Sequence, residues 1–412
     1  LHPVTVTTAL SEDWPGFRGA SGNGITLETE TPLRWSATEG IRWTAPLPRG
    51  ANGSPIVASS RVFVTGAEDE DGRKRALYCF DADSGKPLWQ RTVSFDQTMP
   101  THTPNPAGGT TPASAGERLV GSHGSAGLSA YAMEGEPLWS RDLGEFRHMR
   151  GYGTSPVIVG NRVILHTGPG KRVYVVALDL ETGNILWRHE EPVMGDGERN
   201  TDGNYMGSWA TPVVIERDAR QIAVCAFATR VCGLDVSNGN LVWHCDGLVG
   251  DRGDLAYSSP MIEGDTCVMF GGFKGPSIGF NLAGQGDITT TNSLWRGEDN
   301  PQNIGTGLML GEYVYRVGAG PNFIDCLEAK TGRVVWQERA GDQAFWGSIS
   351  YDGKNAYATD QSGTTFVFKP STGGLRMIAK NELGDTCNAT PALANNRIYI
   401  RTYSKLWCID GK

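Results

Sequence analysis

The residues best suited to bind a ligand or move a proton lie in segments rich in glycine and proline. They are His102, His148, Arg150, Arg199, Asp202, Asn204, Trp209, Arg252, Asp254, Tyr257, Asn303, Trp346 and Asn388. Such groups together suit an anionic or hydroxylated ligand, because cations and amides bind its polar atoms while an aromatic face supports a flat ring. We therefore predict a ligand site built from loops. The alternative is that these loops are simply solvated, as polar loops usually are.

Two enzymatic interpretations use the same residues. In one, Asp202 or Asp254 is a base that takes a proton from an alcohol or a sugar, while Arg150 or Arg252 holds the carboxylates of an oxidising cofactor. In the other, two carboxylates about 5 to 9 Å apart above an aromatic floor cleave a glycosidic bond. The sequence does not choose between these reactions and simple binding.

Metal-binding patterns are weak. Oxygen-bearing side chains alternate from Asp196 to Asn204, as in a calcium loop, but the required glycine spacing and closing glutamate are absent. His102, His123 and His148 fall in successive repeats, yet no H-x-H, H-x-x-x-H or C-x-x-C spacing occurs. We predict no metal site.

One phrase recurs eight times, about every 48 residues. It consists of a small residue, often followed by proline, then alternating apolar residues, a turn of the type Asp-x-x-Thr-Gly and a tryptophan, most clearly in residues 154–187. Each copy is typical of four short antiparallel strands with polar turns. We predict an all-β chain with an N-terminal arm, residues 1–40, and an eight-bladed β-propeller, residues 41–412. The copies open at residues 53–55, 110–112, 154–156, 210–212, 258–260, 305–307, 347–349 and 389–391.

The two ends of the repeat array complement each other. Trp43 ends a fourth-strand pattern before any blade has opened, and the last copy, residues 391–409, stops after its third strand. We predict that the N-terminal strand completes the last blade, which places the termini side by side and removes long open sheet edges.

The loops that join blades are expected to gather on one face around the axis, where a propeller usually binds its ligands. Trp209 and Trp346 stand just before innermost strands in these loops, with Tyr257 in a similar place. These side chains could form a floor under a flat ring. Alternatively, they could close the channel or pack between blades.

Composition excludes several classes. The net charge of −8 and the scattered lysines and arginines argue against a nucleic-acid partner. No apolar run is long enough for a transmembrane helix. The chain begins at Leu1, and we expect a signal peptide to have been removed before it, for a periplasmic or extracellular monomer. The eight cysteines include Cys79, Cys326 and Cys408 at equivalent third-strand positions, where packing explains them.

The repeated phrases, above all residues 177–187 and 327–336, and the opening Asp13-Trp14-Pro15-Gly16-Phe17-Arg18-Gly19 resemble the pyrroloquinoline quinone (PQQ) repeat family over nearly the whole chain. That family contains quinoprotein dehydrogenases as well as the BamB-type scaffold of outer-membrane β-barrel assembly. The resemblance admits PQQ with calcium as cofactor. However, the vicinal Cys-Cys pair of the alcohol dehydrogenases is absent from this sequence, and the cofactor stays unassigned.

The sequence and the resemblance together favour an exported scaffold that binds a small molecule, a glycan or a protein partner through the loop face around its central channel. A PQQ-dependent dehydrogenase of alcohols or sugars is the first alternative. A carbohydrate-binding or carbohydrate-cleaving propeller is the second.

Overall fold

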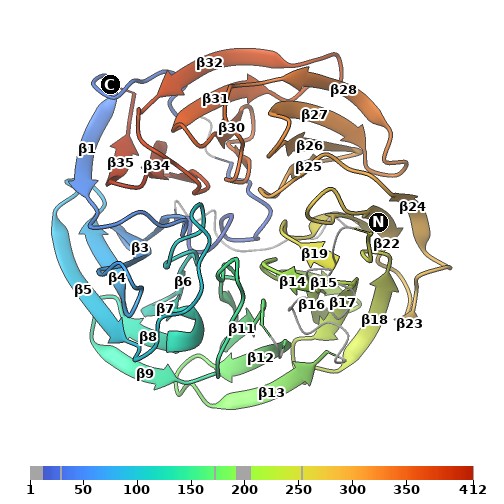
Figure 1. Cartoon of the computed structure of the whole chain (residues 1–412), viewed down its shortest axis with the longest axis horizontal. Coiled ribbons are helices and arrows are strands. Elements are labelled where there is room, and N and C mark those ends of the chain that lie inside the picture. The colour runs from blue at the N-terminus through green and yellow to red at the C-terminus, as the bar shows by residue number, and fades with distance from the viewer. Residues whose placement is uncertain (1–12, 28–29, 171–172, 192–205, 252–253, 412) are drawn as a thin grey trace.

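Eight antiparallel sheets surround one axis in the computed structural model of the chain (Figure 1). The structure describes residues 13–27, 30–170, 173–191, 206–251 and 254–411. Within these residues the only helix is the short 3-10 turn η1 (Gly124–Ala126), and no helix is long and apolar enough to cross a membrane. The predicted all-β, eight-bladed propeller is confirmed.

Each blade is built on four antiparallel strands that follow one another from the axis outward. Blade 1 contains β2 (Ile56–Ala58), β3 (Arg61–Ala67), β4 (Lys74–Asp81) and β5 (Pro87–Ser94). Blade 2 contains β6 (Ala113–Ala115), β7 (Arg118–Ser122), β8 (Leu128–Ala132) and β9 (Pro137–Arg141). Blade 3 contains β10 (Val157–Val159), β11 (Arg162–His166), β12 (Tyr174–Asp179) and β13 (Ile185–Glu190). Blade 4 contains β15 (Val213–Arg217), β16 (Arg220–Ala226), β17 (Arg230–Asp235) and β18 (Leu241–Asp246).

The second half of the ring repeats this arrangement. Blade 5 contains β20 (Met261–Glu263), β21 (Thr266–Phe270), β22 (Ser277–Asn281) and β24 (Ser293–Gly297). Blade 6 contains β25 (Leu308–Leu310), β26 (Tyr313–Val317), β27 (Phe323–Glu328) and β28 (Val334–Arg339). Blade 7 contains β29 (Ser350–Tyr351), β30 (Ala356–Thr359), β31 (Thr364–Lys369) and β32 (Arg376–Glu382). Blade 8 contains β33 (Ala392–Ala394), β34 (Arg397–Arg401), β35 (Lys405–Ile409) and β1 (Ile41–Pro46).

The ring closes through the N-terminal strand, as predicted. Strand β1 pairs antiparallel with β35, from Ile41 opposite Ile409 to Pro46 opposite Lys405. The first strand after the arm therefore becomes the outer strand of the last blade, and separating the two ends of the chain would open this sheet.

The repeated tryptophan and turn join neighbouring blades. Trp139 of blade 2 donates its indole N–H to the backbone oxygen of Leu180 in blade 3, at 2.8 Å. Gly183, in the same turn, has a φ of 66°, and a Cβ atom added to it would lie 2.5 Å from the Trp139 ring. Asp179 shapes the turn by accepting the backbone N–H and hydroxyl of Thr182, each at 2.8 Å. A glycine at this position thus lets an indole pack directly on the next blade.

Three small strands were not predicted. Strands β14 (Met206–Ser208) and β19 (Asp254–Ala256), from connections between blades, pair in parallel near the axis. Strand β23 (Gly286–Asp287) adds a fifth, parallel strand to the outer edge of blade 4. Such two- and three-residue pairings leave little periodic signal in a sequence.

All eight cysteines are buried thiols, including those at the third-strand positions. Burial raises the pKa of Cys79 to about 12, so this thiol is protonated at neutral pH.

Candidate functional site

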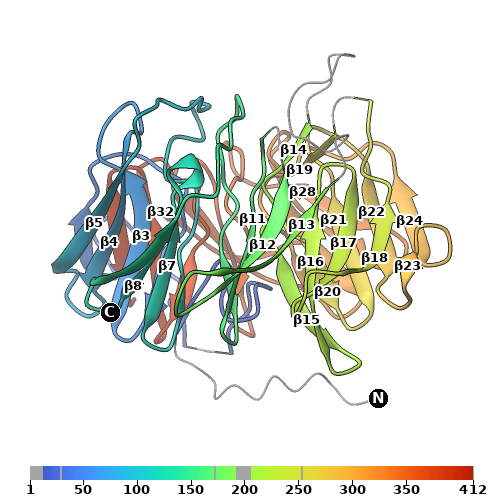
Figure 2. The same ribbon diagram turned by 90° about the horizontal axis from the view of Figure 1, so that it is seen from below.

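A cavity of about 180 Å³ lies on the axis at the face where the connections between blades gather. In the side view the connections after β5 and β9 rise above the blades on this side (Figure 2). We call the cavity the upper pocket. Its lining comes from three sources: the first residues of the blades, the connections between blades, and one residue of the N-terminal arm.

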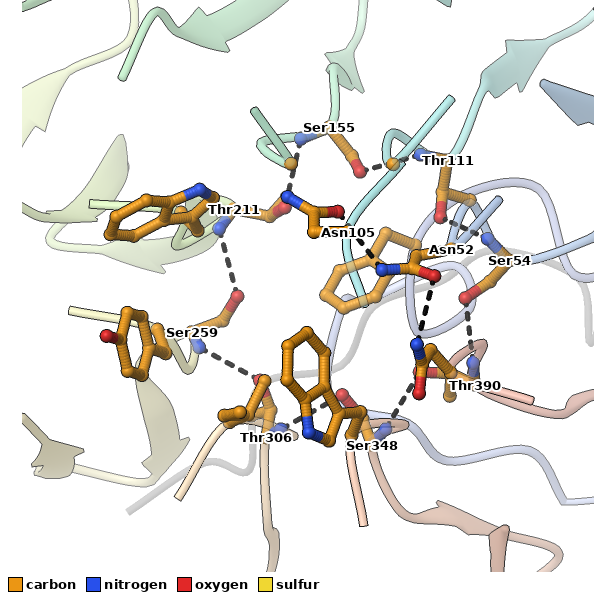
Figure 3. A pocket seen from close by; sticks show the side chains of 18 of the residues that line it. Asn52, Ser54, Asn105, Thr111, Ser155, Thr211, Ser259, Thr306, Ser348 and Thr390 are labelled. Carbon is orange, nitrogen blue, oxygen red and sulfur yellow. Dashed lines mark hydrogen bonds between the residues drawn. The ribbon is translucent and has the colours of Figure 1, made fainter. Parts of the chain in front are cut away.

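Eight buried hydroxyl side chains, one from each blade, form a closed belt of hydrogen bonds that lines the upper pocket (Figure 3). The backbone N–H of each donates to the side-chain oxygen of its counterpart in the next blade, at 2.9 to 3.1 Å. The belt consists of Ser54, Thr111, Ser155, Thr211, Ser259, Thr306, Ser348 and Thr390. The last bond, from the Thr390 N–H to Ser54 Oγ, closes the cycle. The belt leaves the hydroxyl protons unused, so they remain available as donors.

Sequence reasoning missed this belt, although its signal was visible. The second residue of every blade opening is a serine or a threonine. We interpreted these openings only as the small-residue start of a strand. A hydroxyl at the same place in eight repeats indicates a shared hydrogen bond. Glycine or alanine would be equally small at this position but would offer no side-chain oxygen as an acceptor.

Aromatic side chains form much of the wall. Trp209 donates its indole N–H to the Gly151 oxygen at 3.0 Å, and its ring lies 5.2 Å from that of Tyr257 in an edge-to-face arrangement. Trp346 lies parallel to the His102 ring, with centroids 6.5 Å apart. All four of these ring-bearing side chains line the upper pocket. Their faces and edges suit a flat ligand.

Arg150 brings a positive charge to the same wall. Its Nη1 donates to the Tyr257 hydroxyl at 3.2 Å, and its guanidinium lies over the Phe273 ring at 5.3 Å. Burial raises the pKa of Tyr257 to about 12, so the phenol keeps its proton. Burial, and secondly the charge of Arg150, lower the pKa of His102. Among the described lining residues Arg150 is the permanent charge, and none is a carboxylate.

Three asparagines connect the loops of blades 1, 2 and 8. Asn52 donates to Asn105 Oδ1 at 3.0 Å, and Asn388 donates to Asn52 Oδ1 at 3.2 Å. Asn105 also donates to the Arg150 backbone oxygen at 2.8 Å. Asn388 was predicted as a site residue, whereas Asn52 and Asn105 were missed, because isolated amides in a loop carry no recognisable spacing. This network fixes the loops around the pocket mouth.

Other predicted residues stand behind the wall. His148 is buried, packs its ring edge-to-face on Trp209 at 4.9 Å and has Nε2 3.1 Å from the Met206 oxygen. Asp254 lies in β19 and accepts the Gly250 N–H at 3.0 Å. Asn303 donates to the Val317 oxygen at 2.6 Å. These three side chains are not among the residues that line the upper pocket, and their role in a site stays a prediction.

Four predicted residues lie outside the described part of the chain, namely Arg199, Asp202, Asn204 and Arg252. The alternating segment from Asp196 to Asn204 lies outside it as well. Among the residues that the structure does describe, no three histidine, cysteine, aspartate or glutamate side chains are grouped to hold a metal ion. His123 is fully buried, and burial lowers its pKa to about 4.

The N-terminal arm closes the bottom of the upper pocket. Residues 13–26, which we call the floor segment, cross the axis from blade 1 to blade 7, as the blue trace at the centre of Figure 1 shows. Trp14 exchanges two backbone hydrogen bonds with Val57 of blade 1, and the Tyr351 N–H of blade 7 donates to the Gly24 oxygen. Phe17, between these anchors, lines the pocket.

Arg18 fixes the floor segment to the far side of the ring. Its guanidinium is buried and donates to backbone oxygens of Thr306, Gly307 and Ile349 at 2.7 to 3.1 Å, in blades 6 and 7. It also donates within the segment, to the Asn23 oxygen at 2.6 Å. Burial lowers its pKa to about 9, which leaves the side chain charged at neutral pH. The carbonyl dipoles replace the water that burial removes.

Comparison with known proteins agrees with this architecture. The family model described as outer membrane protein assembly factor BamB matches residues 30–98, 73–338 and 326–411. A quinohemoprotein alcohol dehydrogenase, ADH-IIG of Pseudomonas putida, is 26% identical over 269 residues, which are 60% of this chain and 36% of that enzyme. The chain therefore spans little more than a third of the length of this relative.

Solved structures show the same fold at low identity. BamB from Moraxella catarrhalis has a TM-score of 0.63 and 16% identity, covering 89% of this chain and 98% of that one. The quinohemoprotein alcohol dehydrogenase of Comamonas testosteroni has a TM-score of 0.66 and 12% identity, covering 98% and 82%. With its repeats, its closed ring of eight blades and a family match along most of its length, the chain is a PQQ-repeat propeller that belongs to the BamB family.

Proposed function

We propose that this propeller is an exported binding protein whose upper pocket holds a small planar ligand with an anionic substituent. The observation that carries the proposal is the combination of Trp209, Trp346 and Tyr257 with Arg150 in one axial cavity of about 180 Å³. An engineered cavity of about 150 Å³ holds a benzene molecule. The upper pocket thus has room for one aromatic ring, with larger ligands reaching into the open mouth.

The distribution of charge supports an acid as the ligand. Arg150 donates to the Tyr257 hydroxyl and lies over the Phe273 ring, and a planar guanidinium is the side chain best matched to a carboxylate. The hydroxyl belt and the asparagine network add neutral donors around the same cavity. Polar groups of this kind orient a ligand, while the aromatic wall supplies contact area.

PQQ is the planar acid that the family resemblance suggests, and the described residues fit it in part. Two indoles suit its fused rings, and Arg150 suits one of its carboxylates. The described lining offers no carboxylate for the calcium ion, and Asp254, the predicted base, accepts a backbone N–H behind the wall. These contacts favour binding over alcohol oxidation, and we assign no catalytic step.

Titration with quinoline-2-carboxylate, uncharged quinoline and PQQ, with and without Ca²⁺, tests the proposal by calorimetry and tryptophan fluorescence. We expect saturable binding of the acid, at least tenfold tighter than that of quinoline. Arg150→Gln should remove this preference, and Trp346→Ala should weaken both ligands. Trp336→Phe, at the outer edge of blade 6, is the matched control and should leave both affinities unchanged. Equal affinities of the wild type for quinoline-2-carboxylate and for uncharged quinoline would overturn the proposed recognition of the negative charge.

A protein partner at the loop face is the second candidate, because the chain belongs to a family described as an assembly factor. In that case we expect capture of a partner that Arg150→Gln and Trp346→Ala leave intact, since the partner would contact the rim of the face rather than the cavity. Turnover of an alcohol with PQQ, Ca²⁺ and an electron-accepting dye would instead support the dehydrogenase. Saturable binding of glucose would support the carbohydrate alternative.

A further inference from the structure

A second cavity of about 100 Å³ lies beneath the upper pocket, between the floor segment and the innermost strands of blades 2 to 4. We call it the lower cavity. Its walls are mainly aliphatic, with Ala113, Pro156, Val157 and Val213 among them, together with glycines of the floor segment. Ser21, Ser114, Thr211 and Ser259 add polar surface to the same lining, and its aliphatic side chains can contact a small apolar group.

The two cavities share three lining residues, Phe17, Thr211 and Ser259. Thr211 and Ser259 belong to the hydroxyl belt and are fixed by it, with the Thr211 N–H 3.0 Å from Ser259 Oγ. Phe17 is the one member of the three with a large apolar side chain, and it enters from the floor segment. Its half-buried ring therefore forms the apolar part of the partition between the cavities.

The backbone around Phe17 holds this partition in place. The Ser114 N–H of blade 2 donates to the Pro15 oxygen at 2.8 Å, on one side of Phe17. On the other side Arg18 has a φ of 62° and binds backbone oxygens of blades 6 and 7. A non-glycine residue rarely adopts such a φ unless its surroundings impose it. The backbone of Phe17 is thus anchored on both sides.

We propose that Phe17 determines ligand length, because it separates the upper pocket from a lower cavity that accepts a short aliphatic group. In the wild type the lower cavity is a separate site for a small apolar molecule. Without the Phe17 ring the two cavities become continuous, and a ring bound above can extend an alkyl chain below. The limit that Phe17 sets on ligand length, which we call the length rule, rests on the proposed function of the upper pocket. The existence of the lower cavity as a separate site does not rest on it.

Xenon-pressurised crystals test the lower cavity by itself. We expect xenon density among Ala113, Val157 and Val213 in the wild type, and its loss in Val157→Phe, which fills the space. Absence of xenon from this place in the wild type, or its persistence in a folded Val157→Phe variant, would overturn the assignment of the cavity.

Benzoate and 4-propylbenzoate test the role of Phe17. In the wild type we expect the propyl group to change the affinity by less than twofold. In Phe17→Ala, 4-propylbenzoate should bind at least tenfold more tightly than benzoate, since each buried methylene contributes about fourfold. Leu138→Ala, at an exposed position of β9 that lines neither cavity, is the matched control and should behave as the wild type. Circular dichroism and thermal melting verify that each variant is folded.

The outcomes separate this inference from the proposed function. The role of Phe17 would be refuted if the wild type bound 4-propylbenzoate much more tightly than benzoate. It would also be refuted if the ratio of the two affinities were the same in the wild type and in folded Phe17→Ala. Binding of benzoate would still support the upper pocket in both cases. If benzoate binds neither protein, the proposed function fails and the length rule falls with it, and the xenon experiment alone decides whether the lower cavity exists.

Discussion

The hydroxyl belt predicts a specific loss of stability when one hydroxyl is removed. Thr111→Val replaces a buried hydroxyl by a methyl group of nearly equal size, so it creates no cavity. The Ser54 N–H, which now donates to Thr111 Oγ1 at 3.0 Å, is then left without an acceptor. An unsatisfied buried donor costs about 1 to 3 kcal/mol, and we expect the free energy of unfolding to fall by about 2 kcal/mol.

Thr111→Ser is the control, because it keeps the acceptor and removes one methyl group, for a cost of about 0.8 kcal/mol. Thr306→Val breaks the bond from the Ser259 N–H in another part of the ring. Each hydrogen bond ends on a separate side chain, so the two valine variants should be additive within about 0.5 kcal/mol.

Guanidinium denaturation followed by circular dichroism measures these differences, provided that the slope with denaturant is unchanged. A Thr111→Val protein as stable as the wild type, or one no less stable than Thr111→Ser, would refute the reasoning. Water would then satisfy the Ser54 N–H, and the belt would contribute little to the closure of the ring.

Three further predictions concern stability and can be measured by denaturation. Gly183→Ala should cost at least about 2 kcal/mol, because its Cβ would meet the Trp139 ring at a positive φ; an unchanged stability would contradict the blade contact. Arg18→Met should cost about 3 kcal/mol or more by leaving buried carbonyls without donors, with Arg18→Lys in between; equal stability of all three proteins would contradict the anchor. Burial lowers the pKa of His123 and His166 from 6.5 to about 4. The contribution of these two neutral imidazoles to the free energy of unfolding is therefore present above pH 6.5 and is lost as the pH falls towards 4, by up to about 3 kcal/mol each. His166→Gln should make the stability less dependent on pH in this range, and a pH profile equal to that of the wild type would contradict the role of His166.

Local patterns were sufficient to predict the blades. Trp139 and Gly183 belong to a phrase that recurs in register, and a repeated local phrase produces a repeated local structure. The position of Trp43 ahead of the first blade also predicted the closing strand, and its pairing with the last blade confirms this. The candidate residues of the site came from the same topology, because connections between blades must gather around the axis.

Contacts between distant segments could not be predicted in this way. Arg18 binds Thr306 and Ile349, and nothing in the local sequence of the arm indicates these partners. Phe17 was therefore quoted only as part of a family motif, although it closes the pocket. The local sequence also did not indicate the surroundings of Asp254, which was predicted in a loop and lies in β19, where it accepts the backbone N–H of Gly250.

The most direct test of the central claim is a crystal structure of the protein soaked with quinoline-2-carboxylate. We predict that the ring lies in the upper pocket against Trp346, with the carboxylate within hydrogen-bonding distance of Arg150. A ligand bound elsewhere, or a pocket that stays without ligand at concentrations that saturate the calorimetric signal, would contradict the proposed function.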